Sequence, residues 1–142
     1  EEASLQYGNG KSELFVAVID EDRKELNEVL YQVLKDSLHI KNKKAFVKSF
    51  GLKDYFSICK KGWAEAKMMR PTDKQITETT INKYPAVVVE TTETVNGIGV
   101  FYVVAIVETK KTYYQVFTWT LASKKEKNYQ QMKDIINSLK EL

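Results

Sequence analysis

Hydrophobic residues follow two different periods along the chain, and the change between them divides the sequence into predicted elements. From residue 76 to residue 121 the apolar residues occur in short runs rich in β-branched and aromatic side chains, separated by turn residues. This pattern predicts four consecutive antiparallel strands. Asn96-Gly97 is the strongest hairpin signal in the chain, because both residues accept the positive φ of a type I′ turn.

A turn centred on that dipeptide fixes the register of the strands. It pairs Val89 with Val104, and a further turn over residues 109–112 pairs Val104 with Phe117. Two apolar faces result. One holds Val87, Val89, Val100, Tyr102, Val104, Ile106, Phe117 and Trp119, and the other holds Ala86, Val88, Phe101, Val103, Ala105, Val107, Tyr114 and Val116. Since a sheet wetted on one side shows polar alternation, both faces are expected to be covered by helices.

Three segments have helical spacing of apolar residues. The first follows Asp20 to Asp22, which supply an N-cap, and its spacing predicts an amphipathic helix with one buried stripe. The second is interrupted at Gly62 and stopped by Pro71. The third begins at a capping box of Ser123 with Glu126. Their apolar positions are Leu26, Val29, Leu30, Val33, Leu34 and Leu38; then Leu52, Tyr55, Phe56, Cys59, Trp63 and Ala66; then Tyr129, Met132, Ile135, Ile136 and Leu139.

Near the N-terminus, Gly10, Lys11 and Ser12 match the end of a phosphate-binding loop. That motif needs a glycine where Leu5 stands and a helix directly after the serine, whereas a β-rich run follows here. We therefore expect a hairpin over residues 5–19 with a glycine turn, and no phosphate beside Lys11.

Together these elements predict a single α+β domain over residues 1–142, with residues 1–4 as a flexible lead-in. The expected architecture is an antiparallel sheet of about six strands with helices packed on both faces, an α/β/α sandwich. A chain of 142 residues is long enough to bury one ordinary core.

Composition narrows the function classes. The net charge of +3 comes almost wholly from scattered lysines, with Arg23 and Arg70 as the two arginines, which argues against nucleic acid as a partner. The single cysteine, Cys59, excludes an internal disulfide and a cysteine-based metal site. The longest apolar run, residues 98–107, is half of what a membrane helix needs. We expect no cofactor, no metal and no transmembrane segment.

Few residues suggest chemistry. His39 and Cys59 could form a dyad only by assembling in space, and a solvated histidine and a buried thiol are the simpler interpretation. Glu90 points toward apolar neighbours near Val103, so we expect a sheet edge, a lysine partner or a raised pKa in a pocket. If the chain were an enzyme, Glu90, His39 and Tyr102 would be the first residues to mutate.

Three aromatic residues are candidates for a partner surface. Trp63, Tyr55 and Tyr113 are the least secure in the predicted core, and tryptophan and tyrosine dominate interface hot spots. Packing inside the core is the alternative for the same three side chains.

The final half of the chain resembles the PsbP-like, Mog-type superfamily. The resemblance lies in INKYPAVVVE, where Ile81, Asn82, Tyr84, Pro85 and Ala86 match, in Tyr114 to Trp119, and in the closing helix, where Ser138 precedes Leu139 in place of the usual Phe. It implies an α/β/α sandwich and a non-enzymatic role. Members include photosystem accessory proteins, a nuclear-transport factor and exported bacterial proteins or lipoproteins, with no shared catalytic motif.

The predicted function is therefore a non-enzymatic accessory or binding domain that acts through protein-protein contacts. We expect an exported bacterial protein of the periplasm or cell envelope, with its signal segment removed or a lipid anchor upstream of Glu1, and a cytoplasmic location as the alternative. A monomer or a weak dimer is expected. The alternative function is a carrier of small hydrophobic ligands, with a START-like helix-grip cavity under the C-terminal helix.

Overall fold

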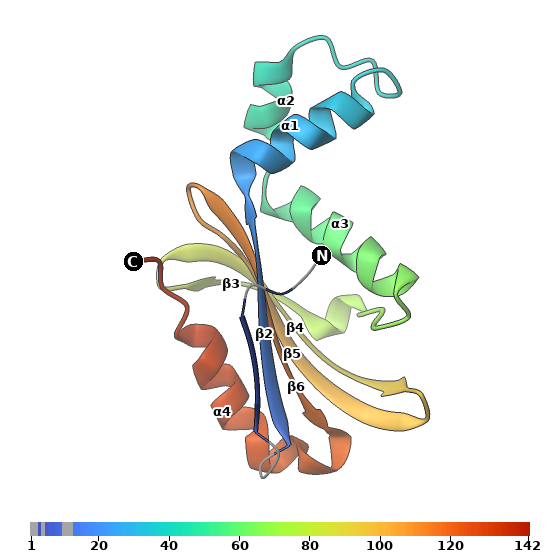
Figure 1. Ribbon diagram of the computed structural model, residues 1–142, viewed down its shortest axis with the longest axis vertical. Helices are drawn as coiled ribbons and strands as arrows, with labels where there is room; N and C mark the ends of the chain where they lie inside the picture. The colour runs from blue at the N-terminus through green and yellow to red at the C-terminus, as the bar shows by residue number, and fades with distance from the viewer. Residues whose placement is uncertain (1–2, 4, 10–12) are drawn as a thin grey trace.

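The computed structural model describes residue 3, residues 5–9 and residues 13–142. Within them, six antiparallel strands form one sheet in the order β1-β2-β6-β5-β4-β3 (Figure 1). The strands are β1 (Leu5–Asn9), β2 (Leu14–Asp22), β3 (Ile76–Ile81), β4 (Tyr84–Val95), β5 (Ile98–Glu108) and β6 (Thr112–Leu121); the helices are α1 (Arg23–Leu34), α2 (Lys43–Ser49), α3 (Leu52–Glu65) and α4 (Lys125–Asn137). The predicted α+β class with an antiparallel sheet is confirmed.

The register of the meander is the one that the turn residues predict. Val89 pairs with Val104, and Val104 pairs with Phe117. At the tip between β4 and β5, Asn96 has φ of 52° and Gly97 has φ of 81°. These values satisfy the type I′ requirement that made the dipeptide a hairpin signal.

The two faces of the sheet carry separate apolar clusters. Helix α3 covers one face and α4 covers the other (Figure 1). The first cluster joins Tyr55, Phe56, Cys59 and Trp63 of α3 to Val87, Val89, Tyr102, Val104, Ile106 and Phe117 of the sheet; the second joins Met132 and Ile136 of α4 to Ala86, Val88, Phe101, Val103, Ala105, Val107 and Val116. Both faces of the central strands are therefore buried, as their two-sided apolar pattern predicts.

The N-terminal hairpin is also confirmed, since β1 pairs with β2 along its length. A Cβ at Gly8 would lie 2.9 Å from the Phe15 ring, so any larger residue at this position would require that ring to shift. The tip of the turn, with Gly10, Lys11 and Ser12, lies outside the described residues. The prediction that no phosphate binds beside Lys11 concerns these residues and stays a prediction. Of the expected lead-in at residues 1–4, residue 3 is described.

Helix α1 begins as predicted and differs in its burial. The Asp22 carboxylate accepts a hydrogen bond from the Glu25 amide at 2.9 Å, which is the expected N-cap. The helix ends at Leu34, and the prediction of one buried stripe is wrong for part of its residues, because Leu26 and Leu30 are half-buried while Val29 and Val33 are exposed.

Two details of the other helices were also predicted wrongly. Gly62 lies inside an uninterrupted α3, which ends at Glu65, well before Pro71. Ser123 does not cap α4, because Ala122–Lys124 continue from β6 as a 3-10 turn and place this serine inside that turn.

Candidate interaction surface on the α1–α2 arm

Residues 23–49, comprising α1, α2 and their connection, form an arm that lies beyond one end of the sheet (Figure 1). Arg23 fixes its base. The guanidinium lies 3.1 Å from the Glu108 carboxylate, donates to the carbonyl oxygen of Thr109 at 2.7 Å, and lies 4.9 Å from the centre of the Tyr113 ring. The Arg23 amide also donates to the carbonyl oxygen of Lys111 at 2.8 Å. These contacts hold the start of α1 to the β5–β6 hairpin.

A row of aromatic rings continues the attachment from the arm to the core. Tyr31 of α1 lies 6.2 Å from Phe46 of α2, and Phe46 lies 6.0 Å from Phe50. Phe50 meets Tyr113 of β6 edge-on at 6.3 Å, and Tyr113 stacks on Tyr55 of α3 at 4.2 Å. Such ring pairs contribute beyond the area that they bury. The inner side of the arm is therefore packed.

The outer side of the arm is apolar and exposed. Val29 is 60% exposed, Val33 is 68% exposed, and Leu38, just after α1, is 62% exposed. Elsewhere in residues 13–141, the exposed large hydrophobic side chains are Ile58 and Ile98, on α3 and at the start of β5. Single exposed apolar residues are ordinary, whereas a group on one element points to an interaction surface. The periodicity placed Val29 and Val33 in the core, because it records which side of α1 is apolar and not what covers it.

Charge is also concentrated on the arm. Its residues include seven basic and three acidic side chains, a net charge of +4 that exceeds the +3 of the whole chain. Lys43 of α2 forms an ion pair with Glu28 of α1. Hydrogen bonds from Lys43 and Gln32 lower the pKa of Glu28. The arm therefore carries three exposed apolar side chains, Val29, Val33 and Leu38, called the apolar ridge below, together with a net positive charge.

The predicted partner surface does not exist as such, because Tyr55, Trp63 and Tyr113 are buried. In the layer between α3 and the sheet, the Tyr55 hydroxyl oxygen accepts a hydrogen bond from the Gln115 side-chain amide at 3.0 Å. Trp63 packs edge-on against Phe117 at 6.0 Å. Burial raises the pKa of both tyrosines. Packing inside the core, the alternative interpretation, is therefore correct for all three residues, since they belong to one buried cluster between α3 and the sheet.

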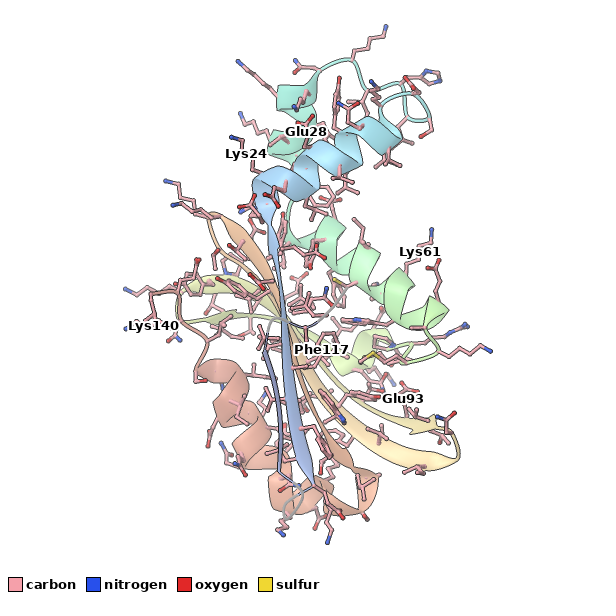
Figure 2. All side chains as sticks on the ribbon, viewed as in Figure 1. Lys24, Glu28, Lys61, Glu93, Phe117 and Lys140 are labelled. Atoms are coloured by element: carbon pink, nitrogen blue, oxygen red, sulfur yellow. The ribbon has the colours of Figure 1, made fainter. Side chains whose placement is uncertain are left out.

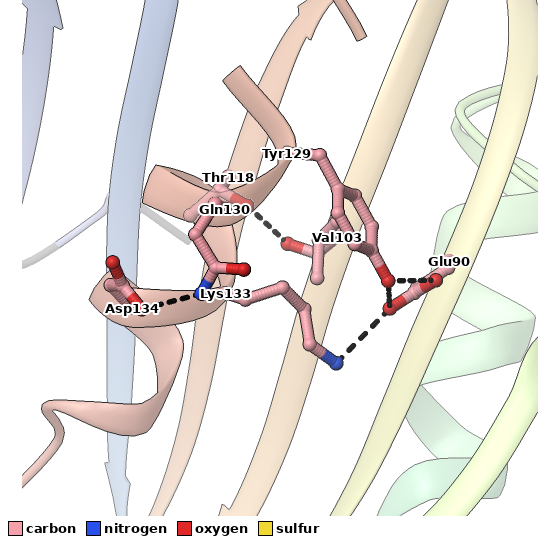
Figure 3. A network of polar contacts seen from close by, with 7 residues as sticks. All are labelled: Glu90, Val103, Thr118, Tyr129, Gln130, Lys133 and Asp134. Atoms are coloured by element: carbon pink, nitrogen blue, oxygen red, sulfur yellow. Dashed lines mark hydrogen bonds and ion pairs between the residues drawn. The ribbon is translucent and has the colours of Figure 1, made fainter. Parts of the chain in front are cut away.

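Glu90 has the lysine partner that was one of its expected explanations. Its carboxylate lies 3.1 Å from the Lys133 ammonium and accepts from the Tyr129 hydroxyl at 2.8 Å (Figure 3). That hydrogen bond, followed by burial, raises the pKa of Tyr129. All three groups lie between α4 and β4, so they attach the helix to the sheet.

The other residues considered for chemistry do not come together as a reactive group. His39 is exposed in the α1–α2 connection, whereas Cys59 and Tyr102 are buried in the layer between α3 and the sheet. Among the described residues, no group of three or more His, Cys, Asp or Glu side chains could hold a metal ion. The arm is therefore the feature of the described chain that most resembles a functional surface.

Comparison with known proteins identifies the fold alone. No family model matches the chain, and no curated protein matches it. The chain is similar to the crystal structure of PA94 from Pseudomonas aeruginosa, a protein of unknown function described as a candidate regulator. The TM-score is 0.58 at 9% sequence identity, over 100% of this chain and 85% of that one. The resemblance to PsbP-like proteins stays a prediction. Within the described residues, no helix has the length and apolarity needed to cross a bilayer.

Proposed function

We propose that this chain is a non-enzymatic accessory domain that binds another protein through the outer side of the α1–α2 arm. The observation that carries the proposal is the exposed ridge of Val29, Val33 and Leu38 on an arm that Arg23 attaches to the β5–β6 hairpin. A PsbP-like sandwich and an exported bacterial location belong to the same proposal. The likeness to PA94 is compatible with an accessory role and supplies no activity.

The charge of the arm defines the kind of partner. An arm that has a net charge of +4 and exposed apolar side chains is complementary to an acidic protein surface that also carries apolar side chains. In such an interface the apolar centre supplies most of the affinity, and the surrounding charges supply orientation and association rate. A second copy of this chain would bring the same positive charge and is disfavoured.

The carrier alternative finds no support in the described part of the chain. A helix-grip carrier needs an apolar cavity between the sheet and the terminal helix. Here the side chains of Met132 and Ile136 are fully buried between α4 and the sheet, in one cluster with Val103 and Val107. At Met132 and Ile136, the space between α4 and the sheet is occupied by the protein's own side chains.

A site-specific photocrosslinker tests the proposal in the native cell. Benzoylphenylalanine replaces Val33 in one strain and Ile98, which is exposed at the opposite hairpin, in the control strain. We expect the Val33 position to form an adduct with an acidic protein and the Ile98 position not to form it. The adduct is then identified, and the purified pair is measured for affinity.

With the purified pair, Val29→Ser together with Val33→Ser should weaken binding about tenfold or more, and rising salt should slow association. The urea midpoint of the double variant should stay close to that of the wild type, which separates lost contact from lost folding. An equal adduct at Ile98, no adduct at Val33, or an adduct between two copies of this chain would each overturn the proposal.

A further inference from the structure

An open cleft of about 340 Å³ lies at the base of the arm, where α1, α2 and the turn between β5 and β6 meet. Its volume is within the range of small-molecule sites. The lining side chains that matter here are Arg23, Lys24, Asn27, Glu28, Lys43 and Lys110. Figure 2 shows Lys24 and Glu28 on α1 at this end of the molecule.

The cleft has a positive charge that its own residues do not neutralise. Four of the lining side chains are cations and one is a carboxylate, and that carboxylate, Glu28, is already paired with Lys43. Arg23 is engaged with Glu108. Within the described residues, Lys24 and Lys110 have no ion pair, and these two lysines come from separate elements to line the same cleft.

Asn27 supplies a second, independent observation. It lies on α1 between these cations, it is 5% exposed, and its side-chain Oδ1 is buried without a hydrogen-bond partner. Buried polar groups in native proteins are almost always hydrogen-bonded, because an unsatisfied one is costly. An acceptor left open beside a group of cations calls for a ligand that is an anion and also carries a hydrogen-bond donor.

We infer that this cleft binds a small phosphate-bearing molecule that also carries a hydroxyl group. The ammonium groups of Lys24 and Lys110 bind the phosphate oxygens from two sides, and the Asn27 side chain turns so that its Oδ1 accepts from the hydroxyl. Monohydrogen phosphate is the simplest molecule with both features, because this doubly charged anion, which predominates at mildly alkaline pH, retains one P–OH. This site is separate from the apolar ridge and does not depend on the proposed protein partner.

The first test is a titration of the full chain with inorganic phosphate, followed by ¹H–¹⁵N correlation spectra, with sulfate as the comparison at equal ionic strength. Sulfate has the same charge and no hydrogen-bond donor. We expect saturable shifts of the amides of residues 23–28, 43–47 and 109–111, with a dissociation constant of about 1 mM or below for phosphate and weaker binding of sulfate.

Two variants and one control separate a built site from general attraction to lysines. Lys110→Gln should weaken the binding of both phosphate and sulfate about tenfold, since a hydrogen bond to a charged group is lost. Asn27→Leu, which is similar in volume, should remove the preference for phosphate over sulfate. Lys111→Gln is the matched control, because Lys111 is next to Lys110 in the turn and does not line the cleft. It should change binding less than about twofold.

Four outcomes would overturn the inference. They are shifts that do not saturate, equal losses in Lys110→Gln and Lys111→Gln, an unchanged phosphate preference in Asn27→Leu, and free glutamate binding as tightly as phosphate. The last result would assign the cleft to carboxylates of an acidic protein instead. In none of these cases is the photocrosslinking result at Val33 affected, so the two proposals fail separately.

Discussion

Helices α1 and α4 have the same kind of sequence and opposite surroundings. Both have an apolar stripe at helical spacing. In α4 this stripe faces the sheet, and Met132 and Ile136 are fully buried against it. In α1 the corresponding residues Val29 and Val33 are exposed, because the arm lies past the end of the sheet (Figure 1). Spacing therefore identifies an apolar face, and the connection to the preceding strand decides whether the sheet covers it.

The largest effect is expected at Met132, in the covered stripe of α4. Met132→Ala should lower the free energy of unfolding by about 2–5 kcal/mol, since it removes a fully buried side chain from the α4–sheet cluster and leaves a cavity. Val33→Ala removes an apolar side chain from the same kind of stripe and should change that energy by no more than about 0.5 kcal/mol. Urea denaturation of both variants measures the difference, and equal losses would mean that α1 is as well covered as α4.

The attachment of the arm is the second point of difference. Arg23→Gln removes the ion pair with Glu108 and a charge-assisted hydrogen bond to Thr109, and should cost about 1–3 kcal/mol, because both charged groups are largely buried. Hydrogen exchange should become faster in residues 23–49 and stay unchanged in α4.

Lys53→Gln is the control for that variant. Its partner Glu78 lies 3.9 Å away, and both side chains are mostly exposed. An exposed pair of this kind contributes about 0–1 kcal/mol. If Lys53→Gln and Arg23→Gln destabilise the chain equally, the arm is not anchored through Arg23.

The polar contacts that attach α4 to the sheet are expected to be weaker than those of Arg23 at the base of the arm. A double-mutant cycle measures the hydrogen bond of 2.8 Å between Tyr129 and Glu90. It compares the wild type with Glu90→Gln, Tyr129→Phe and the double variant. We expect a coupling energy of about 0.5–1 kcal/mol, because the carboxylate is about one-third exposed. Thermal unfolding of the four proteins measures it. A coupling energy of zero would mean that this hydrogen bond does not help to attach the helix, which is then held by contacts such as the packing of Met132 and Ile136 and the buried hydrogen bond from Asn128 to Thr120.

What the sequence could predict follows the range of the interactions. The pairing of Val89 with Val104 was predictable, because Asn96-Gly97 defines the turn locally and alternation fixes each face. The exposure of Val33 was not, since it depends on where α1 leaves the sheet. The cleft was missed for the same reason. In the sequence, Asn27 is one polar residue of a predicted helix and Lys110 is one lysine of a predicted turn. They line one cleft only in the folded chain, where the arm lies against the β5–β6 hairpin.

The smallest effect expected is the protonation of Glu28. Its pKa is lowered in the folded chain by the Lys43 and Gln32 hydrogen bonds, so this pair stabilises the arm above the ordinary glutamate range, and its contribution is lost as the pH falls through the lowered pKa. Because Glu28 is solvated, unfolding experiments would not resolve the loss, and an NMR titration of its carboxyl carbon is the suitable measurement. Lys43→Gln should raise the midpoint, while Lys44→Gln, one residue further along α2, should leave it unchanged. Equal midpoints in the wild type and Lys43→Gln would show that α1 and α2 are held together by the Tyr31–Phe46 contact without help from this ion pair.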